Sequence, residues 1–218
     1  MRKMTKGEMT KERIYNSAKE LFYNQGYNAT TIQQIADHSD TTLGSMTYHF
    51  ATKDTFIARI FDDYLTSINE SLQVKLIGYK PINSFEKHFY LTMVWYQYLL
   101  SDPLVKNFYF EISQNDSLYP FLHGRMSEIY HEFVKDYNLR IRPIEFEALL
   151  IADFGARREL TRSFCEDKIK MPVEDFSILI ISNTARCFGI PQKAIYRVSY
   201  EALLFNRDHD FSEIKLLR

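Results

Sequence analysis

The amino-acid sequence predicts an all-α fold, in which a three-helix head is joined by a long helix to a larger helical body. Apolar residues recur at three- and four-residue spacing along most of the chain, and no segment shows the sustained alternation of a β-strand. Asn-Gly and Asp-Gly hairpin turns are absent. Hydrophobic residues make up 45% of the 218 residues, which is enough to bury a full core.

The prolines predict where the helices of the body begin. All six lie beyond residue 80, and each precedes a stretch of helical periodicity. Proline is tolerated in the first turn of a helix but breaks a helix interior, so these positions indicate helix starts. Helices are therefore expected at residues 82–101, 103–115, 119–137, 143–165, 172–188 and 191–206.

The head begins with a helix expected from about Thr10 to Asn24, followed by Gly26 where a left-handed C-terminal cap is favoured. A second helix is expected to start at Thr31, because Thr31 and Gln34 have the spacing of a capping box. The residues expected to be buried on these two helices are Ile14, Ala18, Leu21, Phe22, Ile32, Ile35 and Ala36.

A short third helix is expected over residues 42–49, and Lys53 opens a long amphipathic helix that extends to about Ile77. On the third helix, Leu43, Met46 and Phe50 are expected to point inward. The long helix is expected to bury Phe56, Ile57, Ile60, Phe61, Tyr64, Leu65 and Ile68. Two short helices joined by a tight turn and packed on a longer one form a helix-turn-helix motif, here at about residues 31–50.

The outward face of the third helix suits contact with DNA. A recognition helix enters the major groove, and its outward residues are small or form hydrogen bonds, which lets the backbone approach phosphates and base edges. Three hydroxyls, a glycine, a phenol and an imidazole lie within eight residues here: Thr42, Gly44, Ser45, Thr47, Tyr48 and His49.

The chain carries a net charge of −1, but the charge is unevenly distributed. Residues 1–60 hold eight Lys/Arg against six Asp/Glu, whereas the remainder holds nineteen against twenty-two. A mildly basic head on a mildly acidic body fits a DNA-binding surface confined to the head.

Targeting and metal-binding patterns are missing. The N-terminal residues lack the apolar region of a secretory signal, and the longest clean apolar run, 176–181, is too short to span a bilayer. Cys165 and Cys187 have no metal-binding spacing. We therefore expect a cytoplasmic protein that holds no cofactor or metal and does not associate with a membrane.

The motif resembles that of the TetR family of transcriptional regulators over about residues 8–68. The resemblance rests on Ala29–Ala36 (ATTIQQIA), Leu43–Phe50 (LGSMTYHF) and the pair Lys53-Asp54. It implies that Gln33 reads a base, where its amide can pair with adenine, and that Leu43 touches an apolar edge such as a thymine methyl. Positions that commonly contact phosphates or sugars are Thr31, Thr42, Ser45, Tyr48, His49 and Lys53.

Several residues depart from the family pattern. Asp40 stands at the usual glycine of the turn, although Asp tolerates left-handed geometry better than most residues. Ser39 and Thr41 replace the usual apolar residues around it, and Thr47 replaces a usual tyrosine. These departures affect the set of DNA contacts rather than the motif.

Aromatic residues crowd the body helices, and the resemblance implies that this region encloses a cavity for a small hydrophobic or aromatic effector. Plain core packing would produce the same composition. The expected wall residues are Phe89, Met93, Tyr96, Phe110, Tyr130 and Phe154. Two carboxylates, Glu111 and Asp153, are embedded in apolar sequence. Each could face a cationic ligand, pair with an internal Arg or Lys such as Arg157 or Arg158, or simply face water.

A dimer interface is expected on the last three helices, residues 143–206. Ala148, Ala152 and Ala156 form a stripe of small residues that lets another helix approach closely, although packing within the chain is an equal alternative. Apolar area on the next helix comes from Ile178, Leu179 and Ile181.

We interpret the chain as a DNA-binding regulator rather than an enzyme. Residues 1–56 would bind a near-palindromic operator, and residues 57–218 would dimerise and bind the effector. The resemblance implies a repressor in which the effector shifts the helix at 54–77. The alternative is an all-α enzyme or metal-binding protein of ferritin type, which requires two Glu-x-x-His pairs, whereas only Glu128–His131 has that spacing.

Overall fold

A computed structural model describes residues 4–79, 83–114 and 118–218, and its all-helical architecture confirms the predicted fold class. Within these ranges the chain forms ten helices and no strand. They are α1 (Lys6–Gln25), α2 (Ile32–His38), α3 (Leu43–His49), α4 (Lys53–Lys75), α5 (Ser84–Leu100), α6 (Pro103–Gln114), α7 (Tyr119–Asp136), α8 (Pro143–Cys165), α9 (Val173–Cys187) and α10 (Gln192–Asp208).

The first helix starts at Lys6, earlier than the sequence analysis predicted. The reason is a second capping box, in which the Thr5 hydroxyl accepts a hydrogen bond from the Glu8 amide and the Glu8 carboxylate accepts one from the Thr5 amide. The capping box predicted at Thr31 and Gln34 is confirmed. Gly26 has the positive φ expected at the end of α1, but its φ of 86° and ψ of 171° lie outside the left-handed helical region, so the predicted left-handed cap is wrong in ψ.

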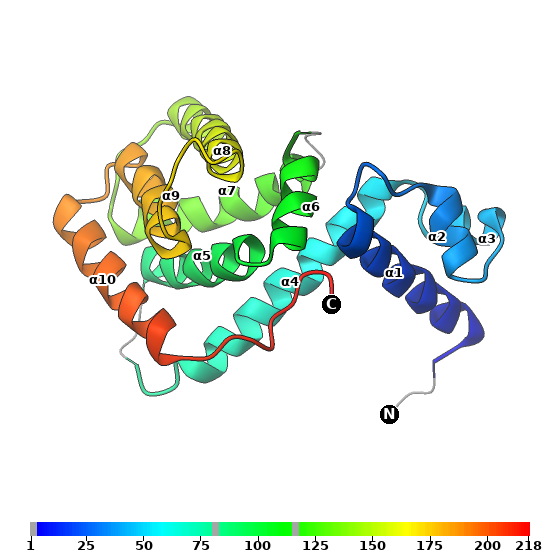
Figure 1. Ribbon diagram of the computed structural model, residues 1–218. Coiled ribbons are helices and arrows are strands. Elements are labelled where there is room, and N and C mark those ends of the chain that lie inside the picture. The colour runs from blue at the N-terminus through cyan, green and yellow to red at the C-terminus, as the bar shows by residue number, and fades with distance from the viewer. Residues whose placement is uncertain (1–3, 80–82, 115–117) are drawn as a thin grey trace.

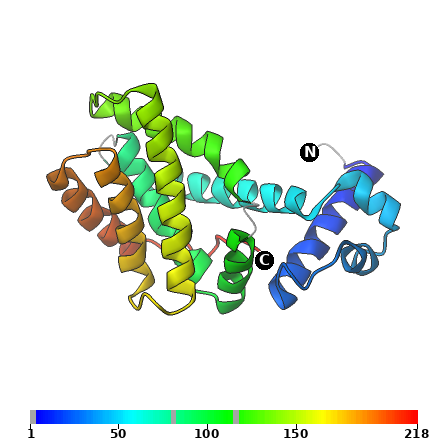
Figure 2. The same cartoon turned by 90° about the horizontal axis from the view of Figure 1, so that it is seen from above.

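The helix α4 joins the head to the body. Figures 1 and 2 show α1–α3 at one end of the molecule and α5–α10 at the other, with α4 running between them. All seven residues predicted to form the buried face of α4 are buried. Near the middle of α4, the Tyr64 hydroxyl donates to the Trp95 carbonyl at 2.8 Å, which ties α4 to α5.

The helix α5 lies at the centre of the body. It contacts α4, α6, α7, α9 and α10, and most of its residues are buried regardless of the face on which they lie. The helix α6 packs against α8 on one side and against α1 of the head on the other. Of the helices described, none is both long enough and apolar enough to cross a membrane.

Residues 209–218, here called the C-terminal strap, were not assigned by the sequence analysis. Figure 1 shows the strap leaving α10 and running along α4 toward the head. It has no regular structure, yet Phe211, Ile214, Leu216 and Leu217 are buried. Apolar side chains therefore hold this segment on the body without the help of helix formation.

Candidate functional site

The helix-turn-helix motif is held together by caps and by a tight turn. The Thr42 hydroxyl caps α3 by accepting a hydrogen bond from the Ser45 amide at 3.1 Å. Asp40 adopts φ 48°, the left-handed geometry expected at this turn position. Arg13 of α1 donates to the Asp40 carbonyl at 3.3 Å, so the long first helix also supports the turn.

The outward face of α3 is open to solvent. Tyr48 is 85% exposed and Leu43 45% exposed, whereas Met46 and Phe50 are buried as predicted. The prediction that Leu43 points inward is wrong. Leu43 is the first residue of α3, and helical side chains lean toward the N-terminal end, which carries this one beyond the edge of the head core. Thr42, Gly44 and Thr47 are also exposed, and Ser45 and His49 are half-buried.

The helix α2 presents Gln33 on the same motif. Its side chain is exposed and donates to the Asp37 carboxylate at 2.7 Å, one turn along the helix. The amide must therefore leave Asp37 before it can pair with a base. Thr31 is exposed as well, but its hydroxyl is already engaged as the cap of α2.

Lys53 has carbonyl partners inside the head. Its ammonium donates to the Tyr27 carbonyl at 2.7 Å and to the Thr30 carbonyl at 3.0 Å, and it lies 4.0 Å from the centre of the Tyr27 ring. Burial lowers the pKa of Lys53, and the nearby Glu111 acts in the opposite direction. Lys53 thus organises the loop at residues 26–30, which leads into α2.

The same loop is held from the body by Glu111 of α6. The Glu111 carboxylate accepts a hydrogen bond from the Asn28 amide at 2.8 Å and one from the Asn107 side chain at 3.1 Å. The expectation that Glu111 lies on the wall of an effector cavity is therefore wrong: the carboxylate faces the head. The sequence did not reveal this, because Glu111 and its partner Asn28 are far apart in the chain.

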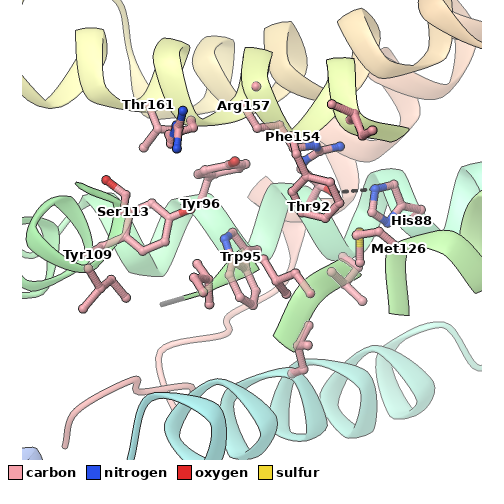
Figure 3. A pocket seen from close by; sticks show the side chains of 18 residues that line it. His88, Thr92, Trp95, Tyr96, Tyr109, Ser113, Met126, Phe154, Arg157 and Thr161 are labelled. Atoms are coloured by element: carbon pink, nitrogen blue, oxygen red, sulfur yellow. Dashed lines mark hydrogen bonds between the residues drawn. The ribbon is translucent and has the colours of Figure 1, made fainter. Parts of the chain in front are cut away.

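A cavity of about 430 Å³ lies in the body between α4, α5, α6, α7 and α8. Its wall is largely aromatic and aliphatic (Figure 3). The residues on the wall are Leu65, His88, Leu91, Thr92, Trp95, Tyr96, Tyr109, Ile112, Ser113, Leu118, Leu122, Met126, Ile151, Phe154, Gly155, Arg157, Arg158 and Thr161. A cavity of this size and apolar character is typical of a small-molecule site.

Only some of the residues predicted to line the cavity do so. Tyr96 and Phe154 lie on the wall, whereas Phe89, Met93, Phe110, Tyr130 and Asp153 do not. Because α5 is surrounded by other helices, its aromatic residues face several neighbours, and Phe89 packs edge-on against Phe85 instead. When a helix is apolar all round, its hydrophobic periodicity cannot distinguish the face on a cavity from the faces packed against other helices. The polar wall residues His88 and Thr92 of α5 were missed for the same reason, and Thr161 of α8 was also missed.

Asp153, which is not on the wall, pairs with the wall residue Arg157, and this is one of the alternatives left open by the sequence. The guanidinium of Arg157 donates to the Asp153 carboxylate at 2.7 Å and also to Tyr130 at 3.1 Å and Thr184 at 2.8 Å. Tyr130 and Thr184 donate to the same carboxylate. Although burial opposes it, the attraction of Asp153 raises the pKa of Arg157 well above its ordinary value. The result is a buried ion pair with its hydrogen bonds satisfied.

The residues predicted for dimerisation lie on α8 and α9. Ala148 and Ala152 are exposed, and Ala156, Ile178 and Leu179 are half-buried. Ile181 is fully buried within the single chain, so its placement on an interface is wrong. Its helix packs along α5, and this contact takes up the face that carries Ile181.

The structure offers no support for the metal-binding alternative. Among the residues that it describes, no three His, Cys, Asp or Glu side chains come together as possible metal ligands. Glu128 and His131, the one pair with suitable spacing, are both exposed. The His131 ring instead packs against Phe146, with ring centres 3.8 Å apart.

Comparison with known proteins agrees with this architecture. Residues 14–60 match the model of a family described as bacterial regulatory proteins, tetR family. The HTH-type transcriptional regulator QacR of Staphylococcus aureus is 30% identical over 137 residues, which cover 59% of this chain and 71% of QacR.

Two solved structures share the fold at low sequence identity. RolR in complex with resorcinol superposes with a TM-score of 0.64 at 14% identity, covering 89% of this chain and 94% of RolR. FadR of Thermus thermophilus, a TetR-family repressor in complex with lauroyl-CoA, superposes with a TM-score of 0.58 at 16% identity, covering 82% of this chain and 92% of FadR. The family match, the QacR relationship and the helix-turn-helix geometry together lead to one conclusion: this chain belongs to the TetR family of bacterial transcriptional regulators.

Proposed function

We propose that this regulator is a homodimeric repressor that leaves its operator when a small hydrophobic or aromatic ligand occupies the cavity. In this proposal residues 1–56 bind DNA, and residues 57–218 form the dimer and hold the ligand. The two heads would enter successive major grooves of a near-palindromic site, roughly 34 Å apart.

One observation carries the proposal: α6 touches both the cavity and the head. Tyr109, Ile112 and Ser113 of this helix line the cavity. Phe108 and Glu111 of the same helix face the head, where the Phe108 ring lies 5.5 Å from that of Phe22 and Glu111 holds the Asn28 amide. A ligand that displaces α6 would therefore move the loop at 26–30, and with it α2.

The related structures support a ligand-dependent role. RolR is known with resorcinol and FadR, a repressor, with lauroyl-CoA, so two proteins of this architecture hold small organic molecules. The aromatic wall of the cavity in this chain suits a molecule of similar character.

The dimer would form through α8 and α9. Ala148 and Ala152 lie exposed on α8, where small side chains permit close approach of a second helix. A self-complementary two-fold interface is expected because a dimer that binds a palindromic operator shares its symmetry.

The DNA-binding part of the proposal is tested by sequencing the DNA that the protein retains from the genome of its source. Gel-shift assays with the recovered site would follow. Gln33→Ala is expected to change the preference among operator variants, and Tyr48→Ala to weaken binding. Gln73→Ala, an exposed position on α4, serves as the control and should leave both unchanged. Unaltered binding by both head variants would contradict the assignment of the groove face.

The coupling part is tested by Glu111→Ala. This change removes the contact between α6 and the Asn28 amide but alters no residue of the cavity wall. We expect ligand binding, measured by a rise in melting temperature, to persist while ligand-induced release of DNA weakens. Equal release by the variant and the unmodified protein would exclude this route.

A further inference from the structure

Two residues of the cavity wall each contain a buried polar atom that has no protein partner. Within the part of the chain that the structure describes, neither His88 Nδ1 nor Thr161 Oγ1 forms a hydrogen bond. His88 is 4% exposed and Thr161 2% exposed, and both line the cavity. An unsatisfied buried polar atom destabilises the folded protein, so a ligand that supplies the missing partner would gain affinity at these two points.

These two atoms belong to opposite ends of the cavity. Figure 3 shows Thr161 near Ser113 and Tyr109 at one end, and His88 near Thr92 and Met126 at the other. Trp95 and Tyr96 lie between the two groups. The space therefore runs lengthwise beside α5, with aromatic rings along its middle and an unpartnered polar atom at each end.

The charge of Arg157 on the cavity wall is balanced within the chain. Among the described residues that line the cavity, none is Asp or Glu. Arg157 is neutralised by Asp153 at 2.7 Å. His88 is uncharged at neutral pH, because burial lowers its pKa well below the ordinary value and the positive charge of Arg157 adds to this effect. A charged ligand would bring an uncompensated charge into an apolar space, which is costly.

We propose, building on the effector role proposed above, that the cavity selects an elongated, uncharged aromatic compound with a hydrogen-bonding group at each end, one for His88 and one for Thr161. The flat middle of such a compound would lie among the rings of Trp95, Tyr96 and Phe154. His88 and Thr161 are then the residues that determine specificity for length and for end groups.

Three compounds on one frame test the charge of the ligand. The frame is biphenyl with the same substituent at both distal ends: hydroxyl, carboxylate or aminomethyl. Binding to the full-length protein is measured by calorimetry at neutral pH. The uncharged diol is expected to bind, and the dianion and dication to bind at least about tenfold more weakly. Tighter binding of either charged compound, or binding of none of the three, would overturn the proposal.

Matched variants test the two ends. Thr161→Val keeps the shape of the side chain and removes the hydroxyl, whereas Thr161→Ser retains the hydroxyl. We expect Thr161→Val to weaken the diol about tenfold and Thr161→Ser to weaken it much less, in line with the loss of one hydrogen bond. Unsubstituted biphenyl should bind both variants equally. At the other end, His88→Phe should weaken the diol by a similar factor, with His88→Asn as the polar control.

Equal affinity of the diol for the unmodified protein, Thr161→Val and His88→Phe would refute the assignment of the two end groups. Operator binding is measured separately in the absence of any compound. A protein that selects the diol but retains no DNA would refute the proposed repressor function and leave the ligand class standing. A protein that binds its operator and prefers a charged biphenyl would refute the proposed ligand class and leave the DNA-binding function standing.

Discussion

Gly26 is the residue at which the head meets the body. Its φ of 86° and ψ of 171° fall in a region that is accessible almost only to glycine. A Cβ atom built at this position would lie 2.9 Å from both carboxylate oxygens of Glu111 and 3.2 Å from the side-chain nitrogen of Asn107. Glycine is required here both for the turn after α1 and for the close approach of α6.

We expect Gly26→Ala to lower the free energy of unfolding by about 1–3 kcal/mol, because the substitution strains the backbone and displaces Glu111. Urea denaturation measures this change. Gly124→Ala is the control: Gly124 lies inside α7 and nothing is near its Cβ position, so alanine should stabilise by up to about 1 kcal/mol. Equal effects of the two substitutions would contradict the role assigned to Gly26.

His88 makes stability depend on pH. Burial lowers its pKa in the folded protein, so between the folded value and the ordinary value of about 6.5 the unfolded chain binds more protons. The contribution of His88 to the free energy of unfolding is therefore fully present above a pH of about 6.5. It is lost as the pH falls below this value, by at most about 1.4 kcal/mol per pH unit.

Denaturation at pH 7 and at pH 5.5 compares the unmodified protein with His88→Asn. The variant should lose less stability between these two values, since it lacks the titrating ring. An identical loss in both proteins would show that His88 does not titrate in this range.

Among the structural elements, α6 and the C-terminal strap connect head and body in addition to α4. The strap contacts several helices. The Phe211 amide donates to the Tyr98 hydroxyl on α5 at 3.2 Å, and Glu213 accepts from Lys75 of α4 at 2.9 Å. The Arg218 guanidinium lies 4.0 Å from the ring of Tyr23 on α1. The strap therefore ties the first helix of the head to the body, in addition to the contact made by α6.

Burial of the leucines holds the strap in place. Leu216→Ala and Leu217→Ala are each expected to destabilise the protein by about 2–5 kcal/mol, the usual cost of truncating a buried leucine. Lys215→Ala, at the exposed position between Ile214 and Leu216, should change stability by less than about 0.5 kcal/mol. Denaturation curves in which all three variants match the unmodified protein would show that the strap is not packed in solution.

At the scale of the whole molecule, the arrangement of heads on DNA would depend on the proposed dimer. Among the described residues, the exposed apolar surfaces of α8 and α10 are two candidates for the dimer interface. One follows α8, where Ala152 lies beside Ile151, and the other follows α10, where Tyr196 and Tyr200 are 66% and 65% exposed. The proposed interface uses the first of these surfaces, because small side chains there let two helices pack closely.

A charge placed on each surface distinguishes the two. We expect Ala152→Glu to weaken the dimer, since two like charges would meet across the two-fold axis and lose solvent. Tyr200→Glu is the matched change on α10 and should leave the dimer intact. Sedimentation at micromolar concentration without DNA measures both. Dissociation caused by Tyr200→Glu alone would move the interface to α10.

Much of the fold was readable from the sequence because it depends on local interactions. The buried face of α4 follows from its periodicity, and the start of α2 follows from Thr31 and Gln34, which lie within one turn of each other. Helix ends also depend on local interactions. The start of α1 was predicted too late because the capping box of Thr5 and Glu8 was overlooked. The turn residue Asp40 was predicted correctly because backbone sterics act on single residues.

By itself, the sequence determined the helical class, the helix-turn-helix motif and the family resemblance, all of which rest on residues close together in the chain. The tertiary structure decided which side of α5 faces a cavity, that Glu111 reaches Asn28 in the head, and that Asp153 is neutralised by Arg157 and hydrogen-bonded to Tyr130 and Thr184. These contacts join residues from different helices. Periodicity specifies that a residue is buried but not what it is buried against, because that depends on how the helices pack.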